Sequence, residues 1–410
     1  MFFKSGIKKK LGLGYSNHSD LLFISQSRLM IYFVILIYTF ILIRKYDIPS
    51  SKNSKGRDFH RYILLIIVVC LAGFSYRVGI DSIRYEYTFE SIPALNEADG
   101  IESLLLSFVL YDPGWVILNS ICKIFVGEFW FVKLITAAFV NTTIFWFVNK
   151  HTQYFFLTIF LYFLLQFWNF NFEILRESIS VCFFLLALDN IIGEKKSFLR
   201  YYLFAAPAIF FHSFGFITFF LPLIQLFDIK KHLKILLIIT IIVTPFLMYF
   251  SDFLTGLGFL GDEAQRKMEE KYTDAGNQYG SGTINYFGMM IRMVTIVSGI
   301  YIIKLMKNKV NKYIVSYGLF YMLVAIMCFG YAILYRIDNY LSIPLFICVV
   351  PFMYECFKRA KDGRFILLFV FLLSTMEPVF HQDYYIKYIP YSSIFNKQEY
   401  PARERVFNNL

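Results

Sequence analysis

The sequence predicts an all-α, polytopic integral membrane protein, and two observations carry that prediction. Of the 410 residues, 58% are hydrophobic and only 17% are charged, whereas a soluble domain has about 25% charged residues. Apolar stretches close to the roughly 17–25 residues that cross a bilayer recur along the chain, at residues 62–76, 129–148, 154–170, 235–250, 313–334 and 365–380. Because these stretches are continuous and do not alternate with polar residues, we expect helices and not the strands of a barrel.

Basic residues between the apolar stretches predict the orientation of the helices. They collect in residues 44–61, 193–200, 228–234, 304–312 and 358–364, and short basic loops stay in the cytoplasm. Acidic residues collect in residues 77–113 and 251–283, which we place outside. The alternation requires that residues 101–126 form a re-entrant or surface-lying pair interrupted at YDPGW. About twelve transmembrane helices, with both termini outside, then satisfy every internal loop.

This topology divides the chain into three parts: a basic amino-terminal segment (1–28), a polytopic membrane domain (29–381) with outer loops 77–128 and 251–283, and an extracytoplasmic carboxy-terminal tail (382–410). No cleavable signal is expected, because the apolar run 29–43 is followed by Arg44 and Lys45. This topology places the lysines of the segment 1–28 outside, although basic residues usually stay in the cytoplasm. An amphipathic segment lying on one leaflet would explain this exception. The net charge of +11 follows from the basic loops, so no nucleic-acid partner is expected.

Ionisable side chains gather at the predicted outer face, although charges in spanning segments are costly and usually line a cavity. They lie in SYRVGIDSIRY, FNFEILRE, IFFHSFGF and LYRIDNYLSIP, and the residues of interest are Arg77, Asp81, Arg176, His212, Arg336 and Tyr340. Three guanidinium groups at one depth predict an anionic ligand, and phosphate matches a planar bidentate donor. The alternatives are arginines that reach the lipid headgroups, an interior histidine at 212, and a Glu177 that pairs with Arg176.

Taken together, these motifs resemble the EpsG-like, Wzy-type family of bacterial polysaccharide polymerases. YRVGIDSIRY keeps the arginine, glycine, aspartate and tyrosine of the family pattern at Arg77, Gly79, Asp81 and Tyr85. YDPGW is similar to a family Glu-Pro-Gly-Phe, LRESIS to an Arg-Gln-x-Ile-Ala helix start, and FHSFGF to a Phe-His-x-Ser element. Arg336, Tyr340 and Pro344 match an outer-turn pattern, and the resemblance covers roughly residues 29–396. The departures from the pattern are Ile80, Ser82, Asp112 and Glu177.

The resemblance implies a glycosyltransferase-type polymerase of the bacterial cytoplasmic membrane. A growing glycan on undecaprenyl diphosphate is transferred to a lipid-linked repeat unit at the outer face, without a metal or other cofactor. A chain-length regulator and a flippase are implied partners, and the product is a surface polysaccharide such as a capsule, an exopolysaccharide or an O-antigen.

Within this reaction each candidate residue has an expected role. Arg176 and Arg336 would hold the departing diphosphate with help from Arg77, because charge grows on the leaving oxygen. His212 is the first choice to accept the proton of the attacking hydroxyl, and Asp81 is the competing base. Four aromatic residues are expected to contact substrate, through stacking on sugar rings or from the site wall: Tyr85, Trp115, Tyr340 and Tyr384.

Other functions remain open from the sequence. A polysaccharide ligase differs only in its acceptor. A transferase that adds one sugar from a lipid donor is disfavoured, because Asp81 has Ser82 and Ile83 beside it and no second acid for a metal. A flippase of lipid-linked oligosaccharide would carry cationic groups deep in a central cavity and a repeat between its halves, which the sequence does not have. The loop 251–283 reads either as a helix between glycine-rich hinges that caps the cavity or as a plain surface loop.

Overall fold

The computed structural model describes residues 31–47, 55–97, 100–256, 286–329, 334–358, 364–376 and 386–408. Regular structure within these ranges is helical apart from two isolated bridges, Ser75 with Ser393 and Ser393 with Asn396. The all-α prediction is therefore confirmed for the described chain. The segment 1–28, most of the loop 251–283 and Tyr384 lie outside the described residues.

The helices follow one another along the chain with short connections. A helix at residues 31–42 continues into η1 (Ile43–Asp47). The first half then contains α3 (Lys55–Gly73), α4 (Ile80–Ser91), α5 (Gly100–Leu110), α6 (Pro113–Phe125), α7 (Phe129–His151), α8 (Phe155–Leu165), η2 (Asn169–Glu173) and α9 (Leu175–Ile192). The second half contains α10 (Phe198–Ala205), α11 (Pro207–Phe211), η3 (Ser213–Phe219), η4 (Leu221–Gln225), α12 (Ile229–Gly256), α15 (Tyr286–Met306), α16 (Lys312–Met327), α17 (Tyr335–Lys358), α18 (Arg364–Thr375) and α20 (Pro401–Asn408).

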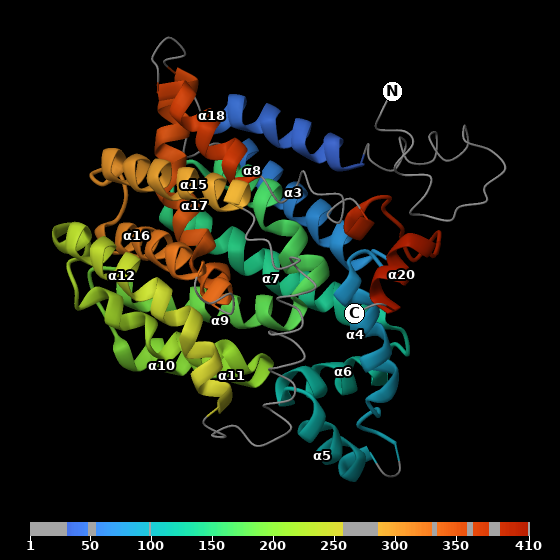
Figure 1. The fold of residues 1–410 in the computed structure, drawn as a ribbon. Helices are drawn as coiled ribbons and strands as arrows, with labels where there is room; N and C mark the ends of the chain where they lie inside the picture. Colours follow the sequence, from blue (N-terminus) through green and yellow to red (C-terminus); the bar gives the residue numbers. More distant parts are fainter. Residues whose placement is uncertain are drawn as a thin grey trace, which may run out of the picture.

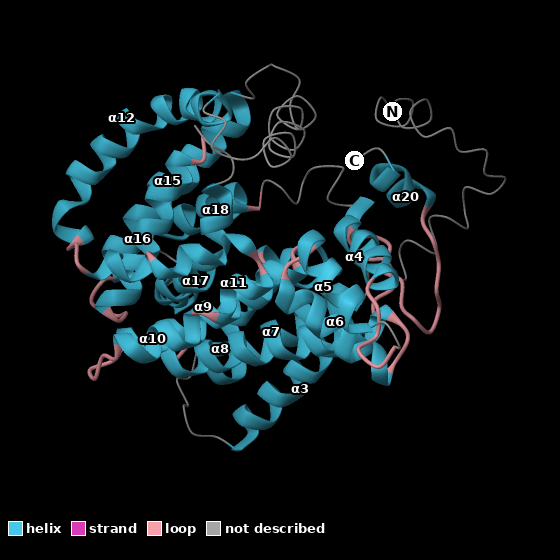
Figure 2. Ribbon diagram, turned by 90° about the horizontal axis from the view of Figure 1, so that it is seen from below, coloured by secondary structure: helices cyan, strands magenta, loops and turns pink. Residues whose placement is uncertain are grey.

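The centre of the molecule is a bundle in which α7, α9 and α17 are surrounded by other helices (Figures 1 and 2). Every side chain of α17 from Ile337 to Met353 is buried, as expected for a helix that is apolar on all sides. The peripheral helix α12 instead exposes a row of large apolar side chains to the surroundings: Ile235, Ile238, Ile239, Ile241, Ile242 and Phe246. A surface of this kind is suited to lipid rather than to water.

Two described helices are long and apolar enough to cross a membrane by themselves, namely α7 and α17. Several other apolar helices have only 10–17 residues, among them α6, α8, α16 and α18. The expected number of about twelve spans is not confirmed. One reason is visible in the expected span at residues 154–170, where α8 stops at Leu165 and the chain then turns through η2.

The expected interruption at YDPGW is present. α5 ends at Leu110 and α6 begins at Pro113, and the pyrrolidine ring is well suited to the first position of a helix. The two helices have 11 and 13 residues, fewer than the roughly 20 that cross the hydrocarbon layer. They lie at one margin of the molecule, at the lower right of Figure 1, where α6 packs against α11.

Helices α9 and α17 run between two polar ends of the bundle. α9 has 18 residues and is therefore about 27 Å long, close to the roughly 30 Å of a hydrocarbon core. Arg176 stands at its beginning, and the carbonyl of Ile192 at its end accepts a hydrogen bond from Asn311 (2.9 Å). The basic connections around Lys309 and Arg364 meet at that same end, where both side chains pair with Glu355.

The position of α4 is fixed by two neighbouring segments. The Glu173 carboxylate accepts the backbone N–H groups of Ile80 and Asp81 (3.0 and 3.2 Å), so it caps the start of α4. Gly79 has a φ of +90°, and a β-carbon there would lie 2.5 Å from the Phe172 carbonyl oxygen. Only glycine fits both the conformation and the close approach. The turn Phe172–Glu173 therefore sets where α4 begins.

The carboxy-terminal tail returns to the same place. Its backbone bonds to the segment before α4, from Tyr76 N–H to the Ser392 carbonyl and from Gly79 N–H to the Lys387 carbonyl (2.8 and 2.9 Å). α20 then packs beside α4 (Figure 1). The buried Arg403 side chain donates to the carbonyls of Arg77, Ile386 and Pro390, and burial lowers its pKa to about 10.

Candidate functional site

Two of the three predicted arginines stand at the beginnings of neighbouring helices. Arg176 is the second residue of α9, and Arg336 is the second residue of α17. About a quarter of each side chain remains exposed, 29% for Arg176 and 26% for Arg336. We call the group formed by Arg176, Arg336, Asp112, Glu177 and His212 the arginine site.

Glu177 holds Arg336 in place. Its Oε2 accepts from Arg336 Nη1 (3.1 Å), and its Oε1 accepts from Asn339 Nδ2 (2.8 Å). Only 2% of Glu177 is exposed, and a buried carboxylate without such partners would be strongly unfavourable. The sequence left open a pair between Glu177 and Arg176. In the structure Glu177 forms its ion pair with Arg336 instead.

Arg176 pairs with Asp112, the residue that precedes α6. Its Nη1 lies 2.7 Å from Asp112 Oδ2, and its guanidinium carbon lies 5.7 Å from the centre of the Tyr85 ring. The Tyr85 ring in turn packs against Trp115 at 5.2 Å between centroids. Arg176 Nε is buried and makes no hydrogen bond of ordinary geometry within the described residues.

His212 stands at the turn between α11 and η3, as the sequence predicts. Its Nδ1 accepts the backbone N–H of Phe214 (3.1 Å), and its Nε2 approaches Arg336 Nη1 to 2.6 Å and Glu177 Oε2 to 3.9 Å. A guanidinium can only donate, so Nε2 is the acceptor in the contact with Arg336, and each ring nitrogen of His212 faces a donor. A neutral imidazole has one lone pair for hydrogen bonding, so a given tautomer accepts from either Phe214 or Arg336.

Asp112 connects the two arginines electrostatically. Burial raises the pKa of Asp112 above its usual value, while Arg176, the Ser213 backbone N–H and Arg336 act in the opposite direction. Both guanidinium groups thus act on one carboxylate. The close approach of α6 and α11 makes this possible, because a β-carbon on Gly114 would lie 2.8 Å from the Phe210 carbonyl oxygen.

Three helices begin at the arginine site. α6 starts beside Asp112, α9 starts one residue before Arg176, and α17 starts one residue before Arg336. Helix amino-termini carry unpaired N–H groups and a partial positive charge of about half an elementary charge each. The site therefore favours an anion even though its two arginines already have carboxylate partners.

Asp81 lies in the first turn of α4 and has a more open side chain. It is 38% exposed, and among the described residues it forms an ion pair with Arg84 at 3.9 Å. Burial raises the pKa of Tyr85 to about 12, Arg176 opposes this rise, and the Asp81 charge adds to it. Asp81 is therefore within electrostatic range of the wall that Tyr85 and Arg176 form.

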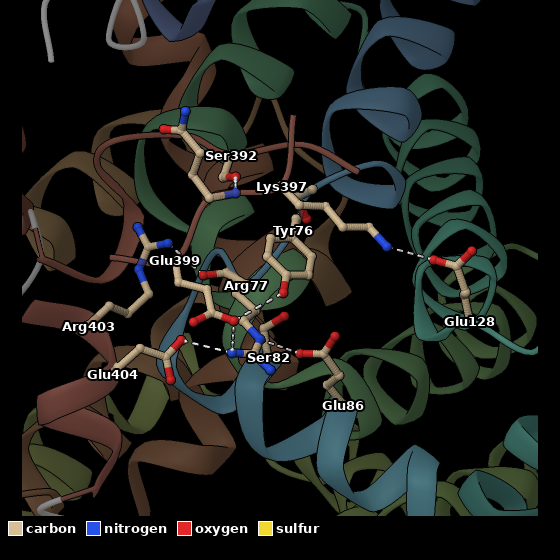
Figure 3. Close-up of polar contacts among 12 residues, drawn as sticks. Tyr76, Arg77, Ser82, Glu86, Glu128, Ser392, Lys397, Glu399, Arg403 and Glu404 are labelled. Carbon is tan, nitrogen blue, oxygen red and sulfur yellow. Dashed lines mark hydrogen bonds and ion pairs between the residues drawn. The ribbon is translucent and has the colours of Figure 1, made fainter. Parts of the chain in front are cut away.

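Arg77 does not join the arginine site. Its guanidinium lies among three carboxylates, with Glu86 at 2.5 Å, Glu399 at 2.9 Å and Glu404 at 3.2 Å (Figure 3). Burial opposes the charge, but the hydrogen bond and the charge of Glu86 raise the pKa of Arg77 further above its ordinary value. The expected triad of arginines is thus a pair, and Arg77 belongs to a separate cluster with the tail.

The aromatic candidates form the walls rather than an open face. Trp115 and Tyr340 have no exposed surface, and Tyr85 is 8% exposed. The Trp115 Nε1 and Tyr340 hydroxyl are buried and make no hydrogen bond of ordinary geometry within the described residues. In this structure none of the three rings is open for stacking on a sugar.

Two residues of the arginine site, Asp112 and Glu177, and the Glu177 partner Asn339 were not among the sequence candidates. Two of them carried a signal in the sequence. Glu177 is one of three charges at the head of an apolar run, and Asp112 precedes a Pro-Gly pair at a helix interruption. The sequence around Asn339 predicts an ordinary turn. Only the hydrogen bond to Glu177 in the structure identifies Asn339 as part of the network around the arginines.

A model of the EpsG family matches residues 58–393. The chain belongs to the EpsG family. No curated protein and no solved structure matches it. Membership in the EpsG family, together with the apolar helices, indicates a membrane protein of polysaccharide biosynthesis with a polymerase-type, glycosyltransferase-like role.

We expect Gly114→Ala to loosen the arginine site. The new β-carbon would meet the backbone of Phe210, which cannot move away as a flexible side chain can, and overpacking of this kind costs about 1–3 kcal/mol. The measurement is the thermal unfolding midpoint of the purified protein in detergent. Gly193→Ala is the matched control, because nothing lies within 4 Å of a β-carbon there. Equal midpoints for the two variants would contradict the tight contact between α6 and α11.

Proposed function

We propose that this chain polymerises lipid-linked oligosaccharide repeat units at the outer face of the bacterial cytoplasmic membrane. The observation that carries the proposal is the convergence of two arginines and three helix amino-termini on one site. Membership in the EpsG family supports the reaction class. The proposed substrates are glycans on undecaprenyl diphosphate, whose diphosphate is the anion that such a site would bind.

In the proposed reaction a growing glycan is the donor. The bond between its anomeric carbon and the phosphate oxygen breaks, and the anomeric carbon forms a bond to a sugar hydroxyl of the acceptor repeat unit. The hydroxyl proton passes to a base, and lipid diphosphate leaves with the bonding electrons. No oxidant or further reactant is needed, because the diphosphate is the leaving group.

Arg176 and Arg336 stabilise the charge that grows on the leaving oxygen. Each guanidinium contacts a carboxylate through Nη1. A diphosphate presents several oxygens in the geometry that a guanidinium prefers. It would bind both arginines from the exposed side and add charge-assisted hydrogen bonds to the groups at the helix ends.

Asp81 fits the role of base better than His212. His212 Nδ1 faces the Phe214 N–H and Nε2 faces the Arg336 guanidinium, both of them donors, so neither ring nitrogen is open to a sugar hydroxyl. The Asp81 carboxylate is open and near Arg176 and Tyr85. We therefore assign proton acceptance to Asp81 and assign to His212 the positioning of Arg336.

Replacing Arg336 with alanine is expected to reduce polymer formation by about 10²–10³-fold, the usual effect of removing one preorganised donor to developing charge. The readout is the gel pattern of surface glycan from a deletion strain carrying each variant, with protein abundance measured by immunoblot. Arg364→Ala is the matched control, because this arginine also pairs with a glutamate but lies at the opposite end of the bundle.

Two outcomes would count against this proposal. Long glycan chains at normal abundance of the Arg336→Ala protein would remove the arginine from the reaction. In the inactive strain, lipid-linked repeat units are expected to collect on the outer leaflet; collection on the inner leaflet would identify a flippase instead.

The choice of base gives a separate expectation. Asp81→Asn should lower polymer formation by about 10²–10⁴-fold, the range of general-base catalysis. His212→Gln keeps an acceptor for Arg336 in its side-chain carbonyl and should lose less. The two variants are compared for transfer rate in membranes supplied with lipid-linked repeat units. A nearly normal rate for Asp81→Asn beside an inactive His212→Gln protein would return the base role to the histidine.

A further inference from the structure

A polar cavity lies beside α4, on the face next to the one that carries Asp81 and Tyr85. Its volume is about 240 Å³, smaller than the roughly 300–1,000 Å³ of pockets for drug-sized ligands. α4, the start of α7, the segment before α4 and the tail all contribute to its lining, through residues that include Arg77, Glu86, Glu90, Trp130, Lys133 and Lys397. We call it the Arg77 cavity.

The charged side chains that line this cavity are balanced, and two further carboxylates lie beside it. Arg77, Lys133 and Lys397 are balanced by Glu86, Glu90 and Glu128 in the lining, and Glu399 and Glu404 add acidic groups beside Arg77 (Figure 3). A diphosphate would meet an excess of carboxylates here. Hydroxyl groups, in contrast, find both acceptors and donors in such a lining.

An aromatic surface completes the lining. Trp130 is partly exposed at the cavity, and its ring packs against Phe74 at 5.8 Å between centroids. Tyr76 contributes a second ring from the segment before α4. An apolar ring face beside several carboxylates matches the two surfaces of a sugar, which has C–H groups on its faces and hydroxyl groups at its edge.

The floor of the cavity is rigid. Lys133 is 3% exposed, and its ammonium donates to the Ser75 carbonyl (3.0 Å), to the Ser75 hydroxyl and to Ser82 Oγ (3.3 Å). Arg77 has a φ of 45°, a conformation that is uncommon for residues other than glycine and that persists where neighbours enforce it. Arg403 does so here by donating to the Arg77 carbonyl. A preorganised lining of this kind binds a ligand with little reordering.

α4 contributes side chains to both sites. Ser82, Glu86 and Glu90 follow one another at four-residue spacing and line the Arg77 cavity, while Asp81 and Tyr85 occupy the adjacent face toward Arg176. A group in the Arg77 cavity and the reacting bond would therefore lie against neighbouring faces of the same helix.

We propose that the Arg77 cavity binds an uncharged sugar residue of the glycan, at a position removed from the bond that is made or broken. This inference rests on the proposed polymerase function. The cavity selects the repeat unit by recognising one of its sugars, through the carboxylates of Glu86 and Glu90 and the ring of Trp130.

The test is the binding of a soluble glycan to the full chain in detergent. The probe is delipidated oligosaccharide prepared from the surface polysaccharide of the producing strain, and the dissociation constant is measured by isothermal titration calorimetry. Trp130→Ala and Glu90→Gln are expected to weaken binding at least about tenfold. Trp146→Ala is the matched control, because this tryptophan lies further along the same helix and is 40% exposed.

Arg336→Ala separates this inference from the proposed function. The variant is expected to bind the oligosaccharide like the wild type while forming no polymer. Failure of the wild type to bind the oligosaccharide, or unchanged affinity in Trp130→Ala and Glu90→Gln, would overturn the sugar cavity and leave the polymerase proposal in place. Normal polymer formation by Arg336→Ala would overturn the proposed function instead.

Discussion

The buried carboxylate of Glu177 is the interaction on which the site depends. It binds Arg336 and Asn339 of α17, and Asn339 Oδ1 in turn accepts from Gln166 and Asn169 (2.9 and 3.3 Å). One charge on α9 thus joins α17, the end of α8 and η2. Because an unpaired buried carboxylate is strongly unfavourable, these partners must stay together. These hydrogen bonds hold the beginning of α9 against the beginning of α17. They therefore set the distance between Arg176 and Arg336.

The sequence predicted the all-helical chain, the interruption at YDPGW and the gathering of Arg176, Arg336 and His212. Each of these follows from local signals: continuous apolar runs, a Pro-Gly pair, and charges at the ends of apolar runs. The number of spans could not be predicted in the same way, because apolar runs such as residues 154–170 break into shorter helices when a buried polar network needs a turn. The carboxylate partners of Arg176 and Arg336 could not be predicted from the sequence either. Glu177 stands next to Arg176 in the chain, yet on a helix adjacent residues do not face each other, and Glu177 instead reaches Arg336.

The sequence placed Arg77 at the same membrane depth as Arg176 and Arg336, but Arg77 lies in a different cluster. It stands only four residues before Asp81, but the tail brings Glu399 and Glu404 to it over more than 300 positions of sequence. Such distant partners leave no local pattern. Two neighbouring faces of α4 therefore serve different sites. The face toward Arg176 carries Asp81 and Tyr85, and the next face lines the Arg77 cavity. A polymerase must both activate a leaving group and recognise a repeat unit, and the two faces offer one place for each task.

In the proposed reaction Arg176 and Arg336 bind one diphosphate together. Cryo-electron microscopy of the full chain with farnesyl diphosphate, a short soluble analogue of the polyprenyl diphosphate, tests this most directly. The account predicts density for the diphosphate within hydrogen-bond distance of both guanidinium groups, with the Arg336 contact to Glu177 lengthened. Density bound elsewhere, with both arginines still on Asp112 and Glu177, would contradict it.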